Sequence, residues 1–239
     1  MRNDVVLTAL DVGSTKVTAI IATVHADNKV EIKGKGECVS LGIESGVIKD
    51  IDSIAKSIRS ALKQAEDKSS LEAINIFASI SGKFIKSQNV IGRTSIVGVQ
   101  SQPGEFTREH VEESIRKAEN NAISNSQLTS ENYEVIHSLP QFYEIDGKKD
   151  IINPVNMTGY HLTSFVHLIT VESTAKRNLL KAIELAGYKV KEPVVSSLAS
   201  GKSVLNNDER HLGAILLDIG GGTTDIAVYY DNIIRLYLS

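Results

Sequence analysis

The chain has 239 residues, of which 41% are hydrophobic and 23% charged, and its formal net charge is −3. This composition is typical of a folded globular protein and excludes disorder along the whole chain, and without a basic excess nucleic acid is not expected as a partner. The single cysteine, Cys38, excludes an internal disulfide framework, and no apolar run has the length of a signal peptide or a membrane span.

The first 80 residues predict three strands, a helix and a fourth strand. Runs rich in β-branched residues cover 5–10, 17–24 and 30–41, and strand composition returns over 73–80. Between them, apolar residues recur at helical spacing over 50–64, where Asp50 or Asp52 is placed to cap the helix. This order of elements is typical of an α/β unit.

The composition then becomes more polar over residues 85–160, which we interpret as a small separate subdomain. This stretch holds three of the four prolines of the chain. It contains one strong helix, predicted over 108–124 with Thr107 as its N-cap, and a strand over 133–138. The segment 140–145, which begins with a proline, follows that strand, and residues 146–147 are a turn dipeptide.

The remainder returns to alternating strands and helices. A strand is predicted over 165–171, and a helix begins at Ser173 and ends before Gly187, the expected C′ residue. Pro193 is expected to break the chain, and a polar link is expected near residue 207. The other elements predicted here are a short helix over 196–204 and strands over 214–217 and 226–230.

One pattern occurs twice, at 9–20 and at 216–228. Each copy is an apolar strand that ends in an aspartate, followed by a glycine turn with hydroxyl residues and a second apolar strand. The two aspartates, Asp11 and Asp218, are 207 positions apart (218 − 11). A Gly-Ser-Thr turn alone is ordinary hairpin chemistry, but three successive glycines in a strand connection are entropically costly without a reason.

The repeated pattern suits a triphosphate held between two hairpins. Glycines allow backbone N–H groups to point at an anion with no Cβ in the way, and hydroxyl groups and a lysine add donors. The two aspartates require a cation between themselves and phosphate, and Mg²⁺ fits carboxylates together with phosphate oxygens. The predicted phosphate-binding residues are Gly13, Ser14, Thr15, Lys16, Gly220, Gly221, Gly222 and Thr223, and the predicted metal residues are Asp11 and Asp218.

Other site patterns are absent from the sequence. It contains no Walker A motif, no dinucleotide-binding glycine fingerprint, no zinc-protease motif and no calcium loop. The six histidines are scattered and there is one cysteine, so no zinc site is indicated. His161 and His167 lie within a strand pattern and are assigned to packing.

These motifs resemble those of the FtsA family of bacterial cell-division proteins, within the superfamily of actin, sugar kinases and heat-shock-chaperone ATPases. The resemblance covers essentially the whole chain. Residues 10–16 and 218–225 resemble the two phosphate motifs. The segments that resemble the family's inserted subdomain are 106–111, 137–143 and 153–159, and 192–199 resembles its first connecting segment.

The resemblance implies an α/β, actin-like (ribonuclease-H-like) fold with an inserted small α+β subdomain. The first actin-like domain would comprise 1–84 and 161–192, the insert 85–160, and the start of an incomplete second domain 193–239. The adenosine-binding segment, the second connecting helix and the membrane helix of the family are expected beyond Ser239.

The family further implies a protein that binds ATP with Mg²⁺, associates with itself into protofilaments and tethers the FtsZ ring to the inner membrane. It would work with other division proteins on the cytoplasmic face of that membrane, attached through a C-terminal helix. Hydrolysis would be slow at most, because no strong general base is evident. Glu192 is either a residue that orders water near the metal or a capping carboxylate before Pro193.

Two alternative functions remain open at this point. In an actin-fold small-molecule kinase, residues 84–160 would line the pocket for the acceptor substrate. In the related actin-like adaptor of pilus assembly, the chain would bind partners without a role in division. The insert distinguishes these alternatives, because it would contact substrate in the kinase and other proteins in the adaptors.

Overall fold

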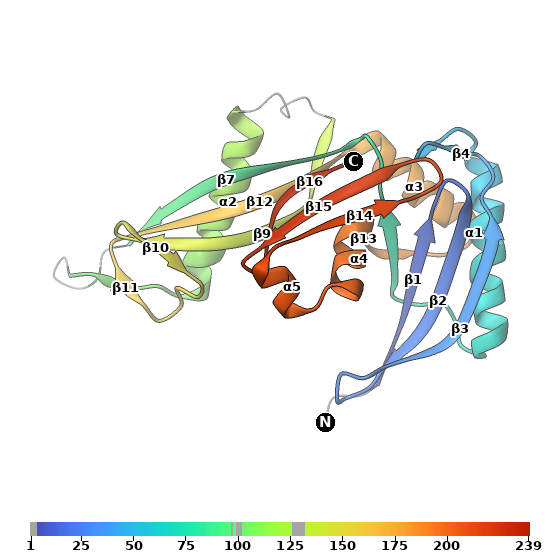
Figure 1. Ribbon diagram of the computed structural model, residues 1–239, viewed down its shortest axis with the longest axis horizontal. Helices are drawn as coiled ribbons and strands as arrows, with labels where there is room; N and C mark the ends of the chain where they lie inside the picture. Colours follow the sequence, from blue (N-terminus) through green and yellow to red (C-terminus); the bar gives the residue numbers. More distant parts are fainter. Residues whose placement is uncertain (1–3, 97, 99–101, 126–131) are drawn as a thin grey trace.

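The computed structural model describes residues 4–96, 98, 102–125 and 132–239. Its elements form three parts, built around a five-stranded, a four-stranded and a three-stranded sheet. The five-stranded and four-stranded sheets lie at opposite ends of the molecule, and the three-stranded sheet lies between them (Figure 1). Two further short strand pairs complete the arrangement.

The first sheet contains the N-terminal hairpin and has the order β13-β6-β1-β2-β3. β2 is antiparallel to both of its neighbours, β1 and β3, whereas β6 is parallel to both β1 and β13. The strands are β1 (Val5–Val12), β2 (Lys16–Val24), β3 (Val30–Val39), β6 (Ile76–Ile80) and β13 (Val190–Val195), with the short pair β4 (Ile43–Glu44) and β5 (Val47–Ile48) beside them.

Two helices, α1 (Ile51–Ser69) and α3 (Ser173–Leu185), pack beside each other against this sheet (Figure 1). Of the two predicted caps of α1 it is Asp50 that accepts from two backbone N–H groups, and Gly187 follows α3 with a φ of 97°. α1 packs so closely on β3 that a Cβ at Gly36 would lie 1.9 Å from the carbonyl oxygen of Ala61.

The insert is a four-stranded antiparallel sheet of order β10-β9-β12-β7, with α2 (Arg108–Asn125) packed on one face. Its last strand, β12, lies wholly beyond residue 160, the predicted boundary, and pairs along its length with β7 and β9. The strands are β7 (Ile85–Ser95), β9 (Tyr133–Ile145), β10 (Lys148–Ile151) and β12 (His161–Glu172), with the pair β8 (Gly104–Glu105) and β11 (Thr158–Gly159) at the far end.

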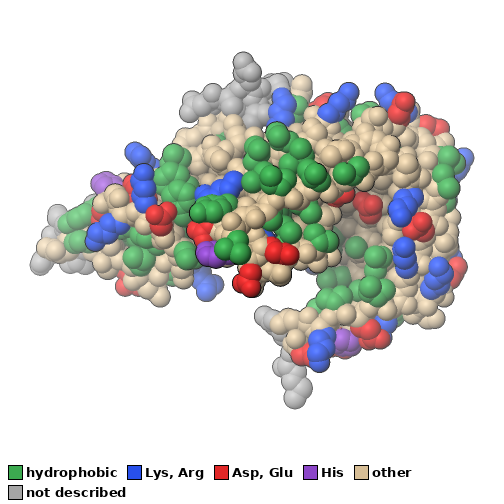
Figure 2. Space-filling model, viewed as in Figure 1, with side chains coloured by type: hydrophobic (Ala, Val, Ile, Leu, Met, Phe, Trp, Pro, Cys, Tyr) green, Lys and Arg blue, Asp and Glu red, His purple; other side chains and the backbone are tan. Residues whose placement is uncertain are grey.

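The third part comprises two short helices and the last three strands. One face of its sheet meets the insert, where the Ser87 hydroxyl donates to the Tyr237 carbonyl and the Gln141 amide donates to the Ile234 carbonyl. The other face exposes Ile215, Leu217 and Ile219, and hydrophobic side chains gather over it in Figure 2. The elements are α4 (Ser196–Val204), α5 (Asn207–Leu212), β14 (Ala214–Ile219), β15 (Thr224–Tyr230) and β16 (Ile233–Leu238).

The structure corrects the sequence prediction at three places. Pro193 does not break the chain but lies inside β13, where it pairs with Ala78. Pro140 does not end its strand either, since β9 continues to Ile145 with a register shift opposite the proline. The expected polar link is helix α5, whose capping box between Asn206 and Glu209 was a readable signal in the sequence.

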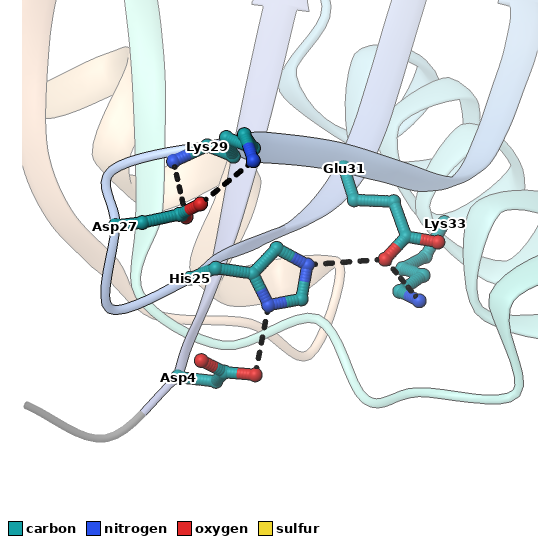
Figure 3. Close-up of polar contacts among 6 residues, drawn as sticks. All are labelled: Asp4, His25, Asp27, Lys29, Glu31 and Lys33. Carbon is teal, nitrogen blue, oxygen red and sulfur yellow. Dashed lines mark hydrogen bonds and ion pairs between the residues drawn. The ribbon is translucent and has the colours of Figure 1, made fainter.

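Two histidines show how burial and charge act in opposite directions. His25 is near the end of the N-terminal hairpin, where Asp4 and Glu31 each accept a hydrogen bond from its ring and raise its pKa (Figure 3). His167 is 1% exposed within the insert sheet, and burial lowers its pKa to about 4. Its Nδ1 is 2.7 Å from the amide oxygen of Asn89.

We expect His167 to make the protein less stable in mild acid. The unfolded chain takes up a proton near the ordinary pKa of 6.5, whereas the folded protein resists protonation until about pH 4. The contribution of His167 is therefore complete above pH 6.5 and is lost as the pH falls towards 4. Between pH 7.5 and 5 the loss is about 2 kcal/mol of unfolding free energy.

Urea unfolding of the wild type and of His167→Gln at pH 7.5 and pH 5 measures this difference. The variant is expected to lose about 2 kcal/mol less than the wild type over that interval. His161→Gln is the matched control, because His161 lies on the same strand but is exposed. The same pH dependence in the wild type and in His167→Gln would contradict the assignment.

Candidate functional site

The two predicted hairpins fold alike. In the first, β1 and β2 are antiparallel and the N–H of Gly13 donates to the carbonyl of Lys16 at 3.0 Å. In the second, β14 and β15 are antiparallel and the N–H of Gly220 donates to the carbonyl of Thr223 at 2.9 Å. The repeated sequence pattern thus produces the same turn in two parts of the molecule.

Both hairpins line one cleft of about 570 Å³. Figure 2 shows this side of the molecule hollowed between the first sheet and the three-stranded sheet. Every predicted phosphate and metal residue lines the cleft, whereas Glu192 does not. The further lining residues are Ala9, Leu10, Val12, Gly46, Phe77, Ser79, Ser81, Val194, Ser196, Ala199, Ser200 and Asp225, so that within the described chain no lining residue comes from 85–160.

The two predicted metal carboxylates have matching partners. The Ser79 hydroxyl, on β6, donates to Oδ1 of Asp11 at 2.5 Å, and the Ser200 hydroxyl, on α4, donates to Oδ2 of Asp218 at 2.9 Å. Within the described residues, the second oxygen of each carboxylate has no hydrogen-bond partner. Each carboxylate therefore keeps one oxygen available to a ligand in the cleft.

The tips of the two hairpins touch each other. A Cβ at Gly221 would lie 2.1 Å from Cγ2 of Thr15, and one at Gly222 would lie 2.5 Å from Oγ of Ser14. None of the predicted phosphate-loop glycines has a positive φ. Close approach between the hairpins therefore gives Gly221 and Gly222 a further reason to be glycine, one that the sequence did not show.

Two predicted donors already have partners on the protein. The Ser14 hydroxyl accepts from the N–H of Gly46 at 3.0 Å, which fixes the first hairpin to the turn between β4 and β5. Nζ of Lys16 lies 3.6 Å from a carboxylate oxygen of Glu37, and both side chains are exposed. An exposed ion pair of this kind is weak, so Lys16 remains available to an anion in the cleft.

Glu192 lies outside the cleft, beside the insert. It is exposed on β13, and its charge acts on His137, whose Nε2 accepts from the N–H of Val195 at 3.2 Å. Burial lowers the pKa of His137, the Glu192 carboxylate opposes this and Lys202 reinforces it. The carboxylate of Glu192 thus lies near the contact between β13 and β9 of the insert. This position does not support its predicted role as a water-ordering residue.

The short helix α4 connects the cleft to the insert. The N–H of Val195, the residue before the helix, donates to His137 of the insert sheet, and Ser200 in the middle of the helix donates to Asp218. The helix also packs against both strands of the second hairpin, β14 and β15. Although the insert lines no part of the cleft in the described chain, it therefore contacts the element that orients one of the two carboxylates.

Sequence reasoning did not assign a role to one acidic residue of the cleft. Asp225 is 2% exposed, faces Asp218 across the second hairpin and accepts from the Tyr237 hydroxyl at 2.7 Å. Burial raises the pKa of Asp225, and the nearby Asp218 acts in the same direction. Its position seven residues after Asp218, on the same motif, was the available signal.

The donor set fits a magnesium nucleotide better than a bare metal ion. Among the described residues, no group of three or more His, Cys, Asp or Glu side chains could hold a metal ion. Mg²⁺ commonly keeps several waters and binds one or two carboxylates together with substrate phosphates. Asp11 and Asp218, each with a free oxygen, match that chemistry, since phosphate and water would supply the remaining ligands.

The chain is similar to cell-division proteins along nearly its whole length. It is 37% identical over 229 residues to the cell division protein FtsA of Buchnera aphidicola subsp. Baizongia pistaciae, covering 96% of this chain and 52% of the relative. It is 38% identical over 226 residues to FtsA of Escherichia coli K12, covering 95% and 51%. The chain therefore spans about half the length of these relatives.

Two further matches concern the domains. Residues 82–170 match the family described as the SHS2 domain inserted in FtsA, which agrees with the extension of the insert sheet through β12. A solved PilM–PilN type IV pilus biogenesis complex superposes with a TM-score of 0.69 over 98% of this chain and 61% of that chain, at 13% identity. This likeness concerns the fold alone, and the predicted actin-like α/β fold with an insert is confirmed.

We expect Gly222→Ala to destabilise the protein, because its Cβ would meet both the Ser14 side chain and the Cα of Ser45 at 3.0 Å or less. Overpacking of this kind typically costs about 1–3 kcal/mol. Urea unfolding measures the change. Gly220→Ala is the control, because the atom nearest to its Cβ would be the carbonyl oxygen of Thr223, at 3.2 Å. An equal loss of unfolding free energy in the two variants would contradict the explanation.

Proposed function

We propose that this chain, which belongs to the FtsA family of cell-division proteins, binds ATP with Mg²⁺ in the cleft between its two hairpins. The observation that carries the proposal is the convergence of both Asp-Gly hairpins, 207 residues apart in the chain (218 − 11), on one cleft. A cleft of about 570 Å³ lies within the usual range for small-molecule sites.

Different cleft residues would bind the phosphates and the Mg²⁺. The turns of the two hairpins, with Ser14, Thr15 and Thr223, would offer N–H and hydroxyl donors to phosphate oxygens, and Lys16 would add a positive charge. Asp11 and Asp218 would hold Mg²⁺, at least partly through water. The cation would supply the charge neutralisation that lets two carboxylates and a triphosphate share the same cleft.

Hydrolysis of the nucleotide, if it occurs, is expected to be slow. Within the described chain, the cleft lining contains no histidine and no glutamate, and Glu192 is outside it. Asp225 lines the cleft, but its carboxylate is buried and engaged by Tyr237. A strong general base for an attacking water is therefore missing among these residues, which fits a nucleotide used for control of assembly.

We further propose that the protein polymerises and tethers the FtsZ ring to the cytoplasmic face of the inner membrane, where it recruits later division proteins. Similarity to division proteins over 95–96% of the chain supports a division role in general. Within the described ranges, no helix has the length and apolar character needed to cross a membrane. The family resemblance implies a C-terminal helix for the proposed attachment.

The kinase alternative lacks the geometry that it needs. A small-molecule kinase would place its acceptor beside the nucleotide, and the insert was the stretch expected to line that pocket. In the described chain, no residue between Ser81 and Val194 lines the cleft, so the insert contributes nothing to it. The pilus-assembly alternative has only the fold in its favour, because the PilM–PilN structure is 13% identical to this chain.

We expect Mg-ATP to raise the melting temperature of the protein. A ligand that binds only the folded state adds about 2.7 kcal/mol of apparent stability at a hundredfold excess over its Kd. For a chain of this size that corresponds to roughly 5–10 °C. A titration of the melting temperature with Mg-ATP measures the effect, with Mg-NAD as the control, and the absence of a shift at millimolar Mg-ATP would refute nucleotide binding.

We expect Asp11→Ala and Asp218→Ala each to weaken Mg-nucleotide binding while leaving the fold intact. Both residues lie at strand ends and outside the apolar core, so circular dichroism is expected to be unchanged. If both act through one cation, the double variant loses less than the sum of the two single losses. Asp208→Ala, on α5 and outside the cleft, is the control, and additive losses would argue against a shared cation.

A further inference from the structure

We propose that Ser79 and Ser200 are positioning residues for the magnesium carboxylates, each holding one aspartate in the orientation that binds the cation. The inference rests on the proposed binding of Mg-nucleotide in the cleft. Its basis is the matched arrangement of two hydroxyl groups, one donating to Asp11 and the other to Asp218, from two elements that lie outside the hairpins.

The first pair joins neighbouring parallel strands. Ser79 is on β6, and its hydroxyl donates to Oδ1 of Asp11 at 2.5 Å while accepting from the N–H of Val12 at 3.1 Å. The hydroxyl is therefore fixed on both sides, and the direction of its proton is set towards the carboxylate. Oδ2 of Asp11 lies 3.9 Å from the position of a Cβ on Gly13, so the free oxygen faces the turn of the phosphate hairpin.

The second pair joins a helix to the other hairpin. Ser200 is on α4, and its hydroxyl donates to Oδ2 of Asp218 at 2.9 Å. Within the described residues this is the only side-chain hydrogen bond of Ser200, and it leaves Oδ1 of Asp218 without a partner. The two aspartates are thus held in the same way from opposite sides of the cleft, although Ser79 and Ser200 come from unrelated elements.

The chemistry of metal sites explains why this arrangement matters. A carboxylate with two free oxygens rotates among several orientations, and binding a cation then costs that freedom. A hydroxyl that donates to one oxygen fixes the group and leaves the other oxygen for the metal or its water. Loss of such an outer partner typically lowers metal affinity about tenfold to hundredfold, because the ligand itself remains but is no longer oriented.

The cleft offers matched control residues. Ser81 lies next to β6 two positions after Ser79, and Ser196 lies on α4 one turn before Ser200. Both line the same cleft and both are partly buried, but neither side chain donates to a carboxylate of the described residues. Replacing them with alanine removes a hydroxyl from the same cleft without touching Asp11 or Asp218.

The test measures how strongly Mg²⁺ and nucleotide favour each other's binding. The Kd for a fluorescent ATP analogue is determined in saturating Mg²⁺ and in EDTA. The Kd in EDTA divided by the Kd in Mg²⁺ gives the coupling between the two ligands. In Ser79→Ala and Ser200→Ala this ratio is expected to fall about tenfold to hundredfold relative to the wild type. In Ser81→Ala and Ser196→Ala it is expected to stay at the wild-type value.

The possible outcomes separate this inference from the proposal on which it rests. A wild type that does not bind the analogue in Mg²⁺ overturns the proposed function and this inference with it. A wild type that binds, with an unchanged coupling ratio in Ser79→Ala and Ser200→Ala, overturns the positioning role alone. Weaker binding by the same factor in Mg²⁺ and in EDTA would assign the hydroxyls to the nucleotide itself and also overturn it.

Folding is checked for each variant by circular dichroism and urea unfolding. Ser79 also accepts a backbone hydrogen bond, so Ser79→Ala could lose stability for that reason. If Ser79→Ala does not fold, the outcome for Ser200→Ala decides, because the Ser200 hydroxyl has no second side-chain hydrogen bond among the described residues. Ser200→Thr, which keeps the hydroxyl, is expected to restore most of the coupling.

Discussion

The close contact between the two hairpin tips is the constraint on which the cleft depends. Gly221 and Gly222 lie against Thr15 and Ser14 with no room for a Cβ. Since the tips meet, the strand ends just before them, which carry Asp11 and Asp218, are brought to one cleft. A contact that is purely steric thus determines that two carboxylates far apart in the sequence can face one ligand.

Much of this architecture could be predicted from local patterns. The strand and helix periods, the Asp50 cap and the repeated Asp-Gly hairpins are encoded within a few residues, and the structure contains them. The strands β7 and β13 were missed because runs of polar residues break the apolar pattern of β7 and because β13 contains Pro193. Their existence depends on pairing with distant strands, which no local pattern encodes.

The residues that line the cleft could be predicted from the sequence, but the contacts that hold them in place could not. The residue types and spacing identified which positions line the cleft, and all of the phosphate and metal predictions do so. The partners Ser79 and Ser200 could not be found in the same way, because a serine on a neighbouring strand or helix has no local signature. For the same reason Glu192 was plausible in sequence, although its strand places it outside the cleft.

The two aspartates of the second hairpin show how environment separates identical groups. Asp218 and Asp225 are directly opposite in the register of β14 and β15. Asp225 is almost fully buried, its pKa is raised by burial, and the Tyr237 hydroxyl holds one oxygen, so it ties β15 to β16. Asp218 is only partly buried and keeps an oxygen free. A cation in the cleft would therefore meet Asp218, because turning the carboxylate of Asp225 towards it would break a buried hydrogen bond and leave Tyr237 without its acceptor.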